Sequence, residues 1–311
     1  MKDLNFVLSL TTRDNDYQME QAACATAAAL RFGIKLQVLF AENDSILQSQ
    51  QLLNVIQSRP EAQPDGIIFE PVGGTALPQV ARAAVAAGIS WVVMNREVDY
   101  LAELRKAYRV PIFSVSSDHE EIGRIQSRQI AALLPQGGSI LYVQGPTENL
   151  ASKLRTAGMQ AAKPSNIQVK IIKGQWTEAS AYKAVSSWLK LSTSQQTQID
   201  AVIAQKDVMA IGAKKAFQEC PPHLRERWAD IAYTGCDGLP KTGQAWVRNG
   251  MLAATVIVPA IAGQAVDMLA RAVQTGIAPP ERTYTIPQSF PALDKLAKAE
   301  PERVHAVAGR Y

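Results

Sequence analysis

Cysteine, histidine and aromatic residues are scarce in this sequence. Its 311 residues include three cysteines and three histidines, and 6% of them are aromatic. Cys24, Cys220 and Cys236 are odd in number and form no CxxC pair, so the sequence indicates no disulfide framework. The three histidines are far apart and have no metal-ligand spacing. We therefore expect neither a disulfide nor a metal site.

A strong charge of either sign is also missing. The 32 basic and 28 acidic residues leave a formal net charge of +4, which a mixed, solvated surface accounts for. Nothing in this balance requires a nucleic acid or an anionic membrane as partner, and we expect neither. The hydrophobic residues, 47% of the chain, are enough for real cores and exclude a disordered chain. At roughly 100–200 residues per domain, the length predicts about two domains.

Long apolar runs are absent. The longest weakly polar stretch, residues 251–263, is interrupted by Pro259 and is shorter than the roughly 18 residues that span a bilayer, so we expect no membrane insertion. Near the N-terminus the apolar run 4–10 is short, carries Asn5 and ends in a polar segment, unlike a secretory signal. As written, the chain is expected to be soluble and without an export signal. Its free thiols fit a reducing compartment.

Motifs of common catalytic sites are missing as well. There is no GxxxxGK[ST], no GxGxxG after a strand, no HExxH and no GxSxG. A histidine-dependent triad would have to use His119, but Asp118 followed by His119 is more typical of a helix that begins behind an aspartate cap. We therefore expect no enzyme activity and no cofactor. An enzyme that uses a carboxylate such as Asp118 or Asp237 is the remaining alternative.

Strand-like and helix-like runs alternate along most of the chain. The strands are expected at residues 4–10, 34–40, 66–69, 90–94, 111–115, 139–143, 167–172, 201–204, 231–235 and 252–258. The helices are expected at residues 15–32, 45–58, 75–87, 120–134, 150–162, 178–191, 207–219 and 260–275. Segment 95–110 is expected to be a loop. The proline-containing tail from residue 276 is expected to wrap over a surface rather than build a sheet.

This alternation predicts an α/β fold with two doubly wound parallel-sheet lobes. In such sheets a ligand binds outside the carboxyl ends of the strands. The loops at those ends are rich in side chains that bond hydroxyl groups in a fixed geometry, namely Asn15, Gln18, Asn95, Arg96, Arg155 and Asp237. Tyr17 and Trp176 add flat apolar surfaces, so the set suits a sugar or polyol. Taken singly, Arg155 could instead be a helix-surface arginine, and Trp176 a core or lid anchor.

Several segments resemble one known family. They are residues 14–18 (DNDYQ), 93–96 (VMNR), 116–118 (SSD), 144–145 (QG), 154–159 (LRTAGM), 204–213 (AQKDVMAIGA) and 234–238 (TGCDG). Across residues 4–285 the sequence resembles periplasmic sugar-binding proteins of the ribose-binding type. The ligand-binding core of lactose-repressor-like regulators shares that fold. The likeness is greatest at 204–213, which resembles a family segment Gln-Asn-Asp-x-Met-Ala-x-Gly-Ala.

The resemblance implies two lobes joined by a three-crossing hinge, with the ligand in the interlobe cleft. One lobe would comprise residues 1–116 and 259–286, and the other residues 117–258 and 287–311. The implied ligand-binding residues are Asn15, Tyr17, Gln18, Asn95, Arg96, Arg155, Trp176, Lys206 and Asp237. Ligand binding would close the hinge, and no bond would be made or broken.

At four positions the sequence departs from the ribose-binding pattern. Asn95 stands in place of the usual aspartate, Lys206 in place of an asparagine, Cys236 in place of an aromatic residue, and Val258 where a glutamine is expected. These differences argue against ribose itself. Losing one carboxylate and gaining an ammonium favours a ligand with a carboxylate or phosphate. The alternative, that Lys206 points to the rim and is only solvated, stays open.

The sequence thus predicts a solute-binding receptor for a sugar or sugar-like small molecule, neutral or anionic, in ABC uptake or sensing. The alternative is a cytoplasmic ligand-sensing module without a DNA-binding domain, which would partner a kinase or a transcription factor. The expected partner is accordingly a membrane transporter or a signalling protein. The resemblance implies a periplasmic location if a leader has been removed, whereas the direct run from Met1 into the first strand favours a cytoplasmic one.

Overall fold

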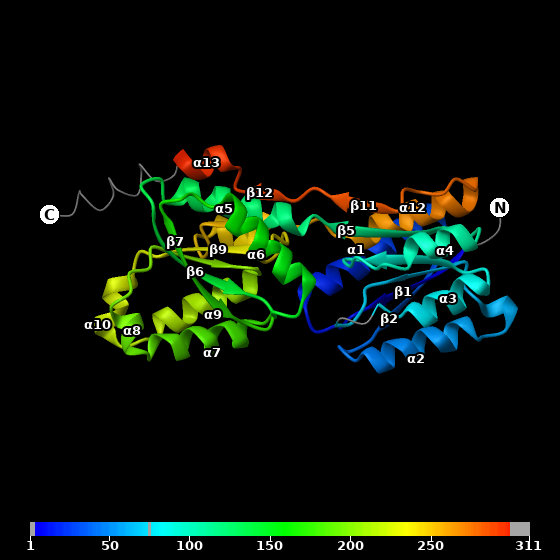
Figure 1. Cartoon of the computed structure of the whole chain (residues 1–311), viewed down its shortest axis with the longest axis horizontal. Helices are drawn as coiled ribbons and strands as arrows, with labels where there is room; N and C mark the ends of the chain where they lie inside the picture. Colours follow the sequence, from blue (N-terminus) through cyan, green and yellow to red (C-terminus); the bar gives the residue numbers. More distant parts are fainter. Residues whose placement is uncertain (1–3, 74–75, 299–311) are drawn as a thin grey trace. The chain divides into compact units, whose positions relative to one another are not determined.

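The chain forms two compact units in the computed structural model, which describes residues 4–73 and 76–298 (Figure 1). The first unit holds the described residues up to Ser117 together with Pro259–Thr285. The second holds Asp118–Val258 and the described residues from Ile286 onward. The chain therefore passes from one unit to the other three times. The start of the predicted helix 75–87 and the outer ends of the predicted lobes lie outside the described residues.

The first unit contains a six-stranded parallel sheet. Its strands are, in order across the sheet, β11 (Arg282–Thr285), β5 (Ile112–Ser117), β4 (Ser90–Met94), β3 (Gly66–Phe69), β1 (Asn5–Leu10) and β2 (Lys35–Phe40). All neighbouring strands run parallel. In this register Leu8 lies opposite Val38 on one side and Ile68 on the other.

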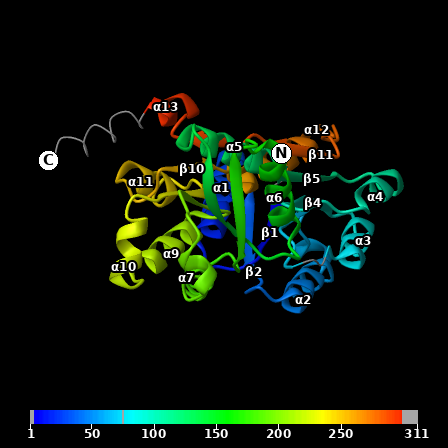
Figure 2. The same ribbon diagram turned by 60° about the vertical axis from the view of Figure 1, so that its left-hand side comes forward.

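Helices cover both faces of this first sheet. Leu8 belongs to a core that α1 (Asp16–Phe32) and α12 (Ile261–Thr275) close. Its neighbour Val7 belongs to the opposite core, which contains residues of α2 (Ser45–Ile56), α3 (Pro78–Ala86) and α4 (Leu101–Ala107). Figure 2 shows α12 and β11, which come late in the chain, beside β5. Because both faces are buried at the centre of the sheet, the inner strands β3 and β4 are apolar almost throughout.

The second unit repeats this plan with one antiparallel edge. Its strands are, in order, β12 (Gln288–Phe290), β10 (Ala254–Ile257), β9 (Ala232–Asp237), β8 (Ala201–Ala204), β6 (Gly138–Gln144) and β7 (Ile167–Lys173). Only the β10–β12 pair among these is antiparallel. Leu141 packs in the core with α7 (Glu178–Leu189) and α9 (Asp207–Gln218). Ile140 faces the opposite core with α5 (His119–Leu133) and α6 (Leu150–Ala162).

Short helices complete the described chain. They are η1 (Pro60–Ala62), α8 (Ser192–Gln195), α10 (Pro222–Arg225), η2 (Glu226–Trp228), α11 (Gly243–Arg248) and α13 (Leu293–Lys298). No helix in the described ranges combines the length and the apolar character needed to cross a membrane.

Helices α5 and α6 approach each other closely through two glycines. A Cβ atom at Gly123 would lie 2.1 Å from the carbonyl oxygen of Arg155, and one at Gly158 would lie 2.0 Å from that of Glu120. Larger residues at these positions would force the helices apart. Ser127 also donates a 2.6 Å hydrogen bond from α5 to the Met159 carbonyl on α6. This contact fixes the helix that carries Arg155.

Two sequence-based expectations about local structure are wrong. Segment 95–110 is not all loop, because it contains α4, whose Leu101 and Leu104 are buried in the core of the first unit. The tail from residue 276 does build sheet, since β11 joins β5 and β12 joins β10. Edge strands expose most of their side chains, and Thr285 is the one buried residue of β11, so the apolar pattern that reveals inner strands is missing.

The structure also assigns two boundary residues differently from the expectation. Ser117 belongs to the first unit and Ile286 to the second. The reason is the β11–β5 ladder, whose last pair is Thr285 with Ser117. Both residues of that pair therefore stay in the first sheet, and the chain leaves the unit directly after them.

Candidate functional site

All nine predicted ligand-binding residues lie at or beyond the carboxyl ends of parallel strands. In the first unit, Asn15, Tyr17 and Gln18 follow β1, and Asn95 and Arg96 follow β4. In the second unit, Arg155 lies on α6 after β6, Trp176 follows β7, Lys206 follows β8, and Asp237 ends β9. Each unit thus has its own sheet and its own set of strand ends.

Four of the predicted residues come together in the second unit. The Arg155 guanidinium carbon lies 5.7 Å from the centre of the Trp176 ring, and Lys206 Nζ lies 6.0 Å from it. Lys206 Nζ also lies 3.5 Å from Asp237 Oδ2. We call Arg155, Trp176, Lys206 and Asp237 the second-unit cluster. It combines hydrogen-bond donors, a carboxylate acceptor and an aromatic surface, which is the mixture that a polyhydroxylated ligand needs.

The Arg155 side chain is buried and held by the backbone. Its Nη1 donates a 2.6 Å hydrogen bond to the carbonyl oxygen of Gln205. An arginine on an exposed helix surface would have no such partner, so the surface interpretation of Arg155 is wrong. The guanidinium is fixed in the unit before any ligand arrives, which reduces the entropy lost on binding.

Gln205 holds together the loops around Arg155 in the second unit. It was not predicted from the sequence as a site residue. It is fully buried, and its Oε1 accepts a 2.9 Å hydrogen bond from Gly145 N. Its Nε2 lies 3.0 Å from the Tyr142 hydroxyl, 3.0 Å from the Ser152 carbonyl and 2.9 Å from the Thr156 hydroxyl. The position of Gln205 directly after a buried strand was the signal that could have found it.

Tyr142 extends this network into α5. Its hydroxyl donates a 3.0 Å hydrogen bond to Gln126 Oε1, and Gln126 Nε2 in turn donates to the Ala204 carbonyl at the end of β8. Complete burial raises the pKa of Tyr142, so the hydroxyl stays protonated and can act as this donor. The chain of hydrogen bonds joins strands β6 and β8 to α5 and α6.

Trp176 is held against a glycine. A Cβ atom at Gly145 would lie 2.4 Å from Cη2 of the indole, so this close approach requires glycine. The backbone of Trp176 has a positive φ of 62°, and the residue is half-buried against the core around Leu141. The core-residue interpretation of Trp176 is therefore right in part, because the ring packs on the core and also lies beside Arg155 and Lys206.

Asp207 lies next to the second-unit cluster and interacts electrostatically with Asp237 and Lys206. It is buried, and its carboxylate accepts hydrogen bonds from the Thr255 hydroxyl at 2.6 Å and from Gly238 N at 2.8 Å. Burial, and after it the nearby Asp237 carboxylate, raise the pKa of Asp207 from 3.8 to about 8. Asp207 is therefore mostly protonated at neutral pH, whereas the Asp237 carboxylate pairs with Lys206.

In the first unit, predicted residues bond to one another and to a carboxylate that we did not predict as a ligand contact. Gln18 is buried, its Nε2 donates a 2.9 Å hydrogen bond to Glu70 Oε2, and its Oε1 accepts one of 3.2 Å from Thr11 N. Asn15 caps α1 by accepting a 2.9 Å hydrogen bond from Gln18 N. A ligand role for Gln18 and Asn15 stays a prediction. Tyr17, on the first turn of the same helix, is half-buried.

Arg96 and Glu70 share an electrostatic interaction in the first unit. Burial lowers the pKa of Arg96, and the Glu70 carboxylate opposes that shift. Asn95, the preceding residue, has a positive φ of 55°. Among the described residues, its Oδ1 is buried and has no hydrogen-bond partner. Such an atom is costly unless something else bonds to it, so Asn95 is the predicted first-unit residue whose buried oxygen could accept a hydrogen bond from a ligand.

The expected helix cap before α5 is confirmed. Asp118 is the N-cap of α5 and accepts a 2.8 Å hydrogen bond from Glu121 N, and His119 is the first residue of the helix. Asp118 is thus occupied as a cap. Among the residues that the structure describes, no group of three or more histidine, cysteine or acidic side chains could hold a metal ion.

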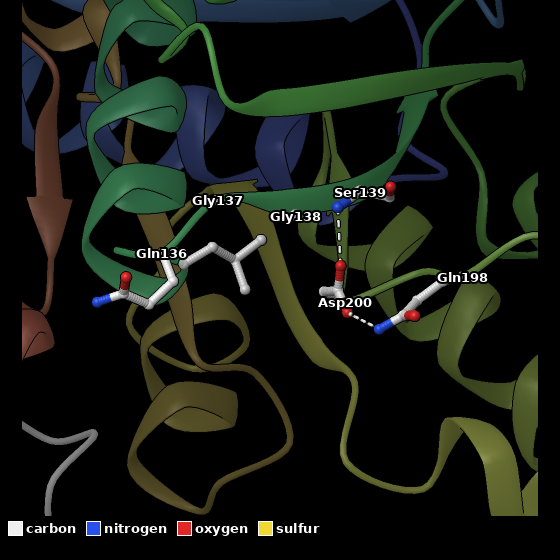
Figure 3. A pocket seen from close by; sticks show the side chains of 7 residues that line it. Gln136, Gly137, Gly138, Ser139, Gln198 and Asp200 are labelled. Atoms are coloured by element: carbon white, nitrogen blue, oxygen red, sulfur yellow. Dashed lines mark hydrogen bonds between the residues drawn. The ribbon is translucent and has the colours of Figure 1, made fainter.

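A hollow lies at the other end of the second sheet from the cluster, at the amino end of strand β6 (Figure 3). It has a volume of about 440 Å³ and is lined by Leu134, Gln136, Gly137, Gly138, Ser139, Gln198 and Asp200. The Asp200 carboxylate there accepts hydrogen bonds from Ser139 N at 2.7 Å and from Gln198 Nε2 at 2.8 Å. The Asp200 carboxylate thus joins β6 to the segment before β8. We therefore assign this hollow a structural role.

Comparison with known proteins gives one family match and several relatives. Residues 6–277 match a family model described as a periplasmic binding protein domain. A D-xylose-binding periplasmic protein from Haemophilus influenzae is 28% identical over 219 residues, which are 70% of this chain and 62% of that relative. The match thus spans less than two thirds of that relative. A ribose import binding protein from Salmonella typhimurium is 26% identical over 250 residues, 80% of this chain and 77% of the relative.

Solved structures share the fold. One is an ABC transporter periplasmic solute binding protein from Actinobacillus succinogenes with bound D-allose, with a TM-score of 0.80 and 19% identity over 95% of this chain and 100% of that chain. Another, from Bacillus halodurans with bound myo-inositol, has a TM-score of 0.76 and 21% identity over 96% and 98% of the two chains. The predicted fold of two doubly wound α/β lobes is confirmed.

Proposed function

The chain belongs to the periplasmic binding protein family, and on that premise we propose that it is a receptor that binds a sugar or a sugar-like solute. The names of two relatives, a D-xylose-binding and a ribose import binding protein, support a carbohydrate as the class of ligand. The departures at Asn95, Lys206 and Cys236 argue for a solute other than ribose.

The second-unit cluster is the observation that carries this proposal. Trp176 offers an aromatic face of the kind that stacks on the C–H face of a sugar ring. Arg155 offers several N–H donors in a plane, and the Asp237 carboxylate can accept from two hydroxyls. The hydrogen bonds of Gln205 hold Arg155 and the Gly145 loop in place, so the cluster is organised before the ligand binds.

Binding without conversion of the ligand is the form of this function that we propose. The relatives are binding proteins, and Asp118, one of the two carboxylates considered for catalysis, is engaged as a helix cap. The other, Asp237, pairs with Lys206 and would act as a hydrogen-bond acceptor. Incubation with a bound sugar, followed by NMR of the recovered sugar, checks this. Recovery of a changed sugar would show catalysis instead.

A panel of solutes tests the binding function itself. We expect heat on titration, and a raised melting temperature, with at least one compound among pentoses, hexoses, inositols and sugar acids. The variant Arg155→Lys should weaken that binding at least tenfold, because a lysine cannot reproduce the planar set of donors. Arg248→Lys is the matched control, since Arg248 is exposed and bonds to Gln244 on its own helix. No response to any compound would overturn the proposal.

The partner we propose is a membrane transporter that takes up the solute, as the import and ABC transporter names of similar proteins suggest. Rotation of the units at the three chain passages on ligand binding stays a prediction. Small-angle scattering with and without the bound sugar checks that prediction, since closure reduces the radius of gyration. A pull-down with the transporter tests this partner. If the transporter is not retained while sugar binding persists, sensing through a kinase or a transcription factor is favoured.

A further inference from the structure

The backbone of Asp237 in the second unit is held in a conformation that residues with a side chain rarely adopt. Its φ is 114°, within the left-handed region that favours glycine. A backbone of this kind is unfavourable and persists only where surrounding contacts hold it. The peptide group that joins Asp237 to Gly238 is fixed at both of its polar atoms. Its carbonyl oxygen accepts a 3.0 Å hydrogen bond from Val258 N, and its N–H donates a 2.8 Å hydrogen bond to Asp207 Oδ2.

Asp207 supplies one of these two bonds with its side chain. It is the first residue of α9 and directly follows Lys206, whose Nζ lies 3.5 Å from Asp237 Oδ2. Two consecutive residues after β8 therefore contact two consecutive residues at the end of β9. Lys206 contacts the Asp237 side chain, and Asp207 holds the peptide group that follows it. The position of the Asp237 carboxylate thus depends on both contacts.

The Asp207 carboxyl group has little room to move. Its other oxygen, Oδ1, accepts a 2.6 Å hydrogen bond from the Thr255 hydroxyl on β10. A Cβ atom at Gly235 would overlap Oδ1, and one at Gly243 would overlap Oδ2, so two residues without a side chain enclose the group. Asp207 itself is 2% exposed. An enclosed group with both oxygens bonded holds its partners in a fixed geometry.

The charge state of Asp207 indicates which substitution keeps these contacts. Burial, and after it the Asp237 carboxylate, raise the pKa of Asp207 to about 8, so the side chain is mostly a neutral carboxylic acid at pH 7. A neutral acid has an acceptor oxygen and an O–H donor, and an amide has an acceptor oxygen and N–H donors. The Thr255 hydroxyl can donate or accept, so it can bond to either group. Asp207→Asn should therefore preserve both contacts, whereas Asp207→Ala removes them.

A second aspartate in the same unit makes similar contacts in another place. Asp200 accepts hydrogen bonds from Ser139 N at 2.7 Å and from Gln198 Nε2 at 2.8 Å, at the amino end of β6 (Figure 3). Like Asp207, it bonds to one backbone N–H and one side chain. Unlike Asp207, it lies at the opposite end of the sheet from the predicted ligand-binding residues. Asp200 therefore provides a comparison for a purely structural aspartate.

We propose, on the basis of the receptor function above, that Asp207 is a positioning residue of the binding site. It is too deeply buried to contact the solute. Its carboxyl group fixes the peptide between Asp237 and Gly238 in the strained conformation that directs the Asp237 carboxylate toward the hydroxyls of the solute. Asp207 thereby sets the affinity through Asp237, in addition to stabilising the fold.

Crystal structures of the ligand-free protein test the geometric part of this inference. In Asp207→Ala the peptide after Asp237 loses one of its two bonds. We therefore expect the φ of Asp237 to leave the left-handed region and its carboxylate to move by about 1 Å or more. In Asp207→Asn both should stay in place. An unmoved Asp237 in Asp207→Ala would overturn the inference, whether or not a solute has been found.

Calorimetry tests the effect on binding, with the tightest binder among D-xylose, D-galactose, D-glucuronate and myo-inositol as the probe. Asp207→Ala should weaken probe binding about tenfold or more, and Asp207→Asn less than about threefold. An equal loss in the two variants would overturn the inference. Failure of every compound to bind to the unmodified protein would instead overturn the receptor function, and the crystal structures would then decide the inference alone.

Asp200→Ala is the matched control. It also removes two hydrogen bonds of a carboxylate in the second unit, so it should lower the urea midpoint of unfolding. Probe binding should change less than about twofold, because Asp200 is remote from Asp237. A loss of binding as large as in Asp207→Ala would show a general effect of destabilisation and would overturn the inference.

Thr255→Val covers the case in which Asp207→Ala does not fold. It removes the hydroxyl that bonds to Asp207 Oδ1 and leaves the carboxyl group present. Probe binding should weaken about threefold, and Thr255→Ser should restore it. Unchanged binding in Thr255→Val would contradict the inference.

A double-mutant cycle shows whether Asp207 acts through Asp237. In an Asp237→Ala background there is no carboxylate to position, so adding Asp207→Ala should weaken probe binding less than about twofold further. The effects of the two single variants would then be far from additive. A further loss of about tenfold in that background would show that Asp207 affects binding by another route, and would overturn the inference.

Discussion

The two units build similar parallel sheets and hold polar side chains at the carboxyl ends of their own strands, but they hold them in different ways. In the first unit Gln18 donates a hydrogen bond to Glu70, and the Glu70 carboxylate interacts with Arg96. In the second unit a buried residue, Gln205, holds the Gly145 loop and Arg155 through its own hydrogen bonds.

This contrast teaches that equivalent positions in one fold can serve different tasks. The second-unit cluster is pre-organised, so we expect it to supply most of the affinity and the selection of ligand. In the first unit the buried Asn95 Oδ1 has no hydrogen-bond partner among the described residues. We expect it to contribute directional hydrogen bonds.

The largest expected effect comes from removing the organiser of the second unit. Gln205→Leu should lower the free energy of unfolding by roughly 3 kcal/mol, since the amide can make three hydrogen bonds at a time, one through Oε1 and two through the two hydrogens of Nε2, at about 1 kcal/mol each. Ligand affinity should fall with it, because Gly145 N and the Thr156 hydroxyl lose a partner. Urea unfolding measures the first effect and calorimetry the second.

The control for this variant is Gln218→Leu, at an exposed position on α9. It should change the free energy of unfolding by less than about 0.5 kcal/mol. If Gln205→Leu behaved in the same way, the second unit would not depend on its buried network, and the contrast between the units would disappear.

The next effect concerns pH. The folded pKa of Asp207, about 8, lies above its ordinary value of 3.8, so folding takes up a proton between those values. The stability that this group provides is fully present below about pH 4 and is lost as the pH rises toward 8. Asp207→Asn removes this dependence, so its stability relative to the unmodified chain should rise steadily between pH 4 and pH 8. Urea midpoints from pH 5 to pH 9 check the trend.

Several groups face Asp207 and enter this prediction. They are Asp237 and Cys236 on β9, Lys206 directly before α9 and the neutral Thr255 on β10. Asp230→Asn, at an exposed position, is the control and should follow the unmodified chain. Parallel curves for Asp207→Asn and the unmodified chain would mean that Asp207 titrates normally.

The smallest effect distinguishes a cap from a ligand contact in the first unit. Asn15→Ala should lower stability by about 1 kcal/mol, because the hydrogen bond from Gln18 N to Asn15 Oδ1 is lost. Asn15→Ser keeps a capping oxygen and should be nearly neutral in thermal unfolding. If both variants weaken ligand binding, the amide contacts the ligand. If only Asn15→Ala does, Asn15 acts through the helix alone.

Much of the fold was accessible from the sequence because buried parallel strands are short, continuous apolar runs. The strands at 66–69, 90–94 and 201–204 have the predicted bounds, and the glycine after α1 ends that helix as expected. Strands β11 and β12 were missed because an edge strand needs few apolar residues. The helix α4 was missed because its seven residues give too short a pattern to show a period.

The site was only partly predictable, for a different reason. Loop position and side-chain chemistry brought out Arg155, Trp176, Lys206 and Asp237. In the structure Arg155 and Lys206 lie beside the Trp176 ring, and Asp237 lies beside Lys206. Gln205 and Glu70 were missed as site residues because a polar residue that works through other residues has no distinctive spacing. Its importance depends on contacts between segments far apart in the chain, such as Gln205 with Gly145 and Ser152.

The first unit is built from two segments that are far apart in the chain, and this affects folding during synthesis on the ribosome. When synthesis reaches Val258, β1 and α1 have long been made, but α12 and β11 have not. The core around Leu8 and Ala25 then lacks Ile261, Ala265 and Leu269. Its apolar face therefore stays exposed to solvent while residues 118–258 are translated. Such a face is a target for chaperones and a hazard for aggregation. The order of translation is thus not the order of folding: both units depend on the last described segments of the chain.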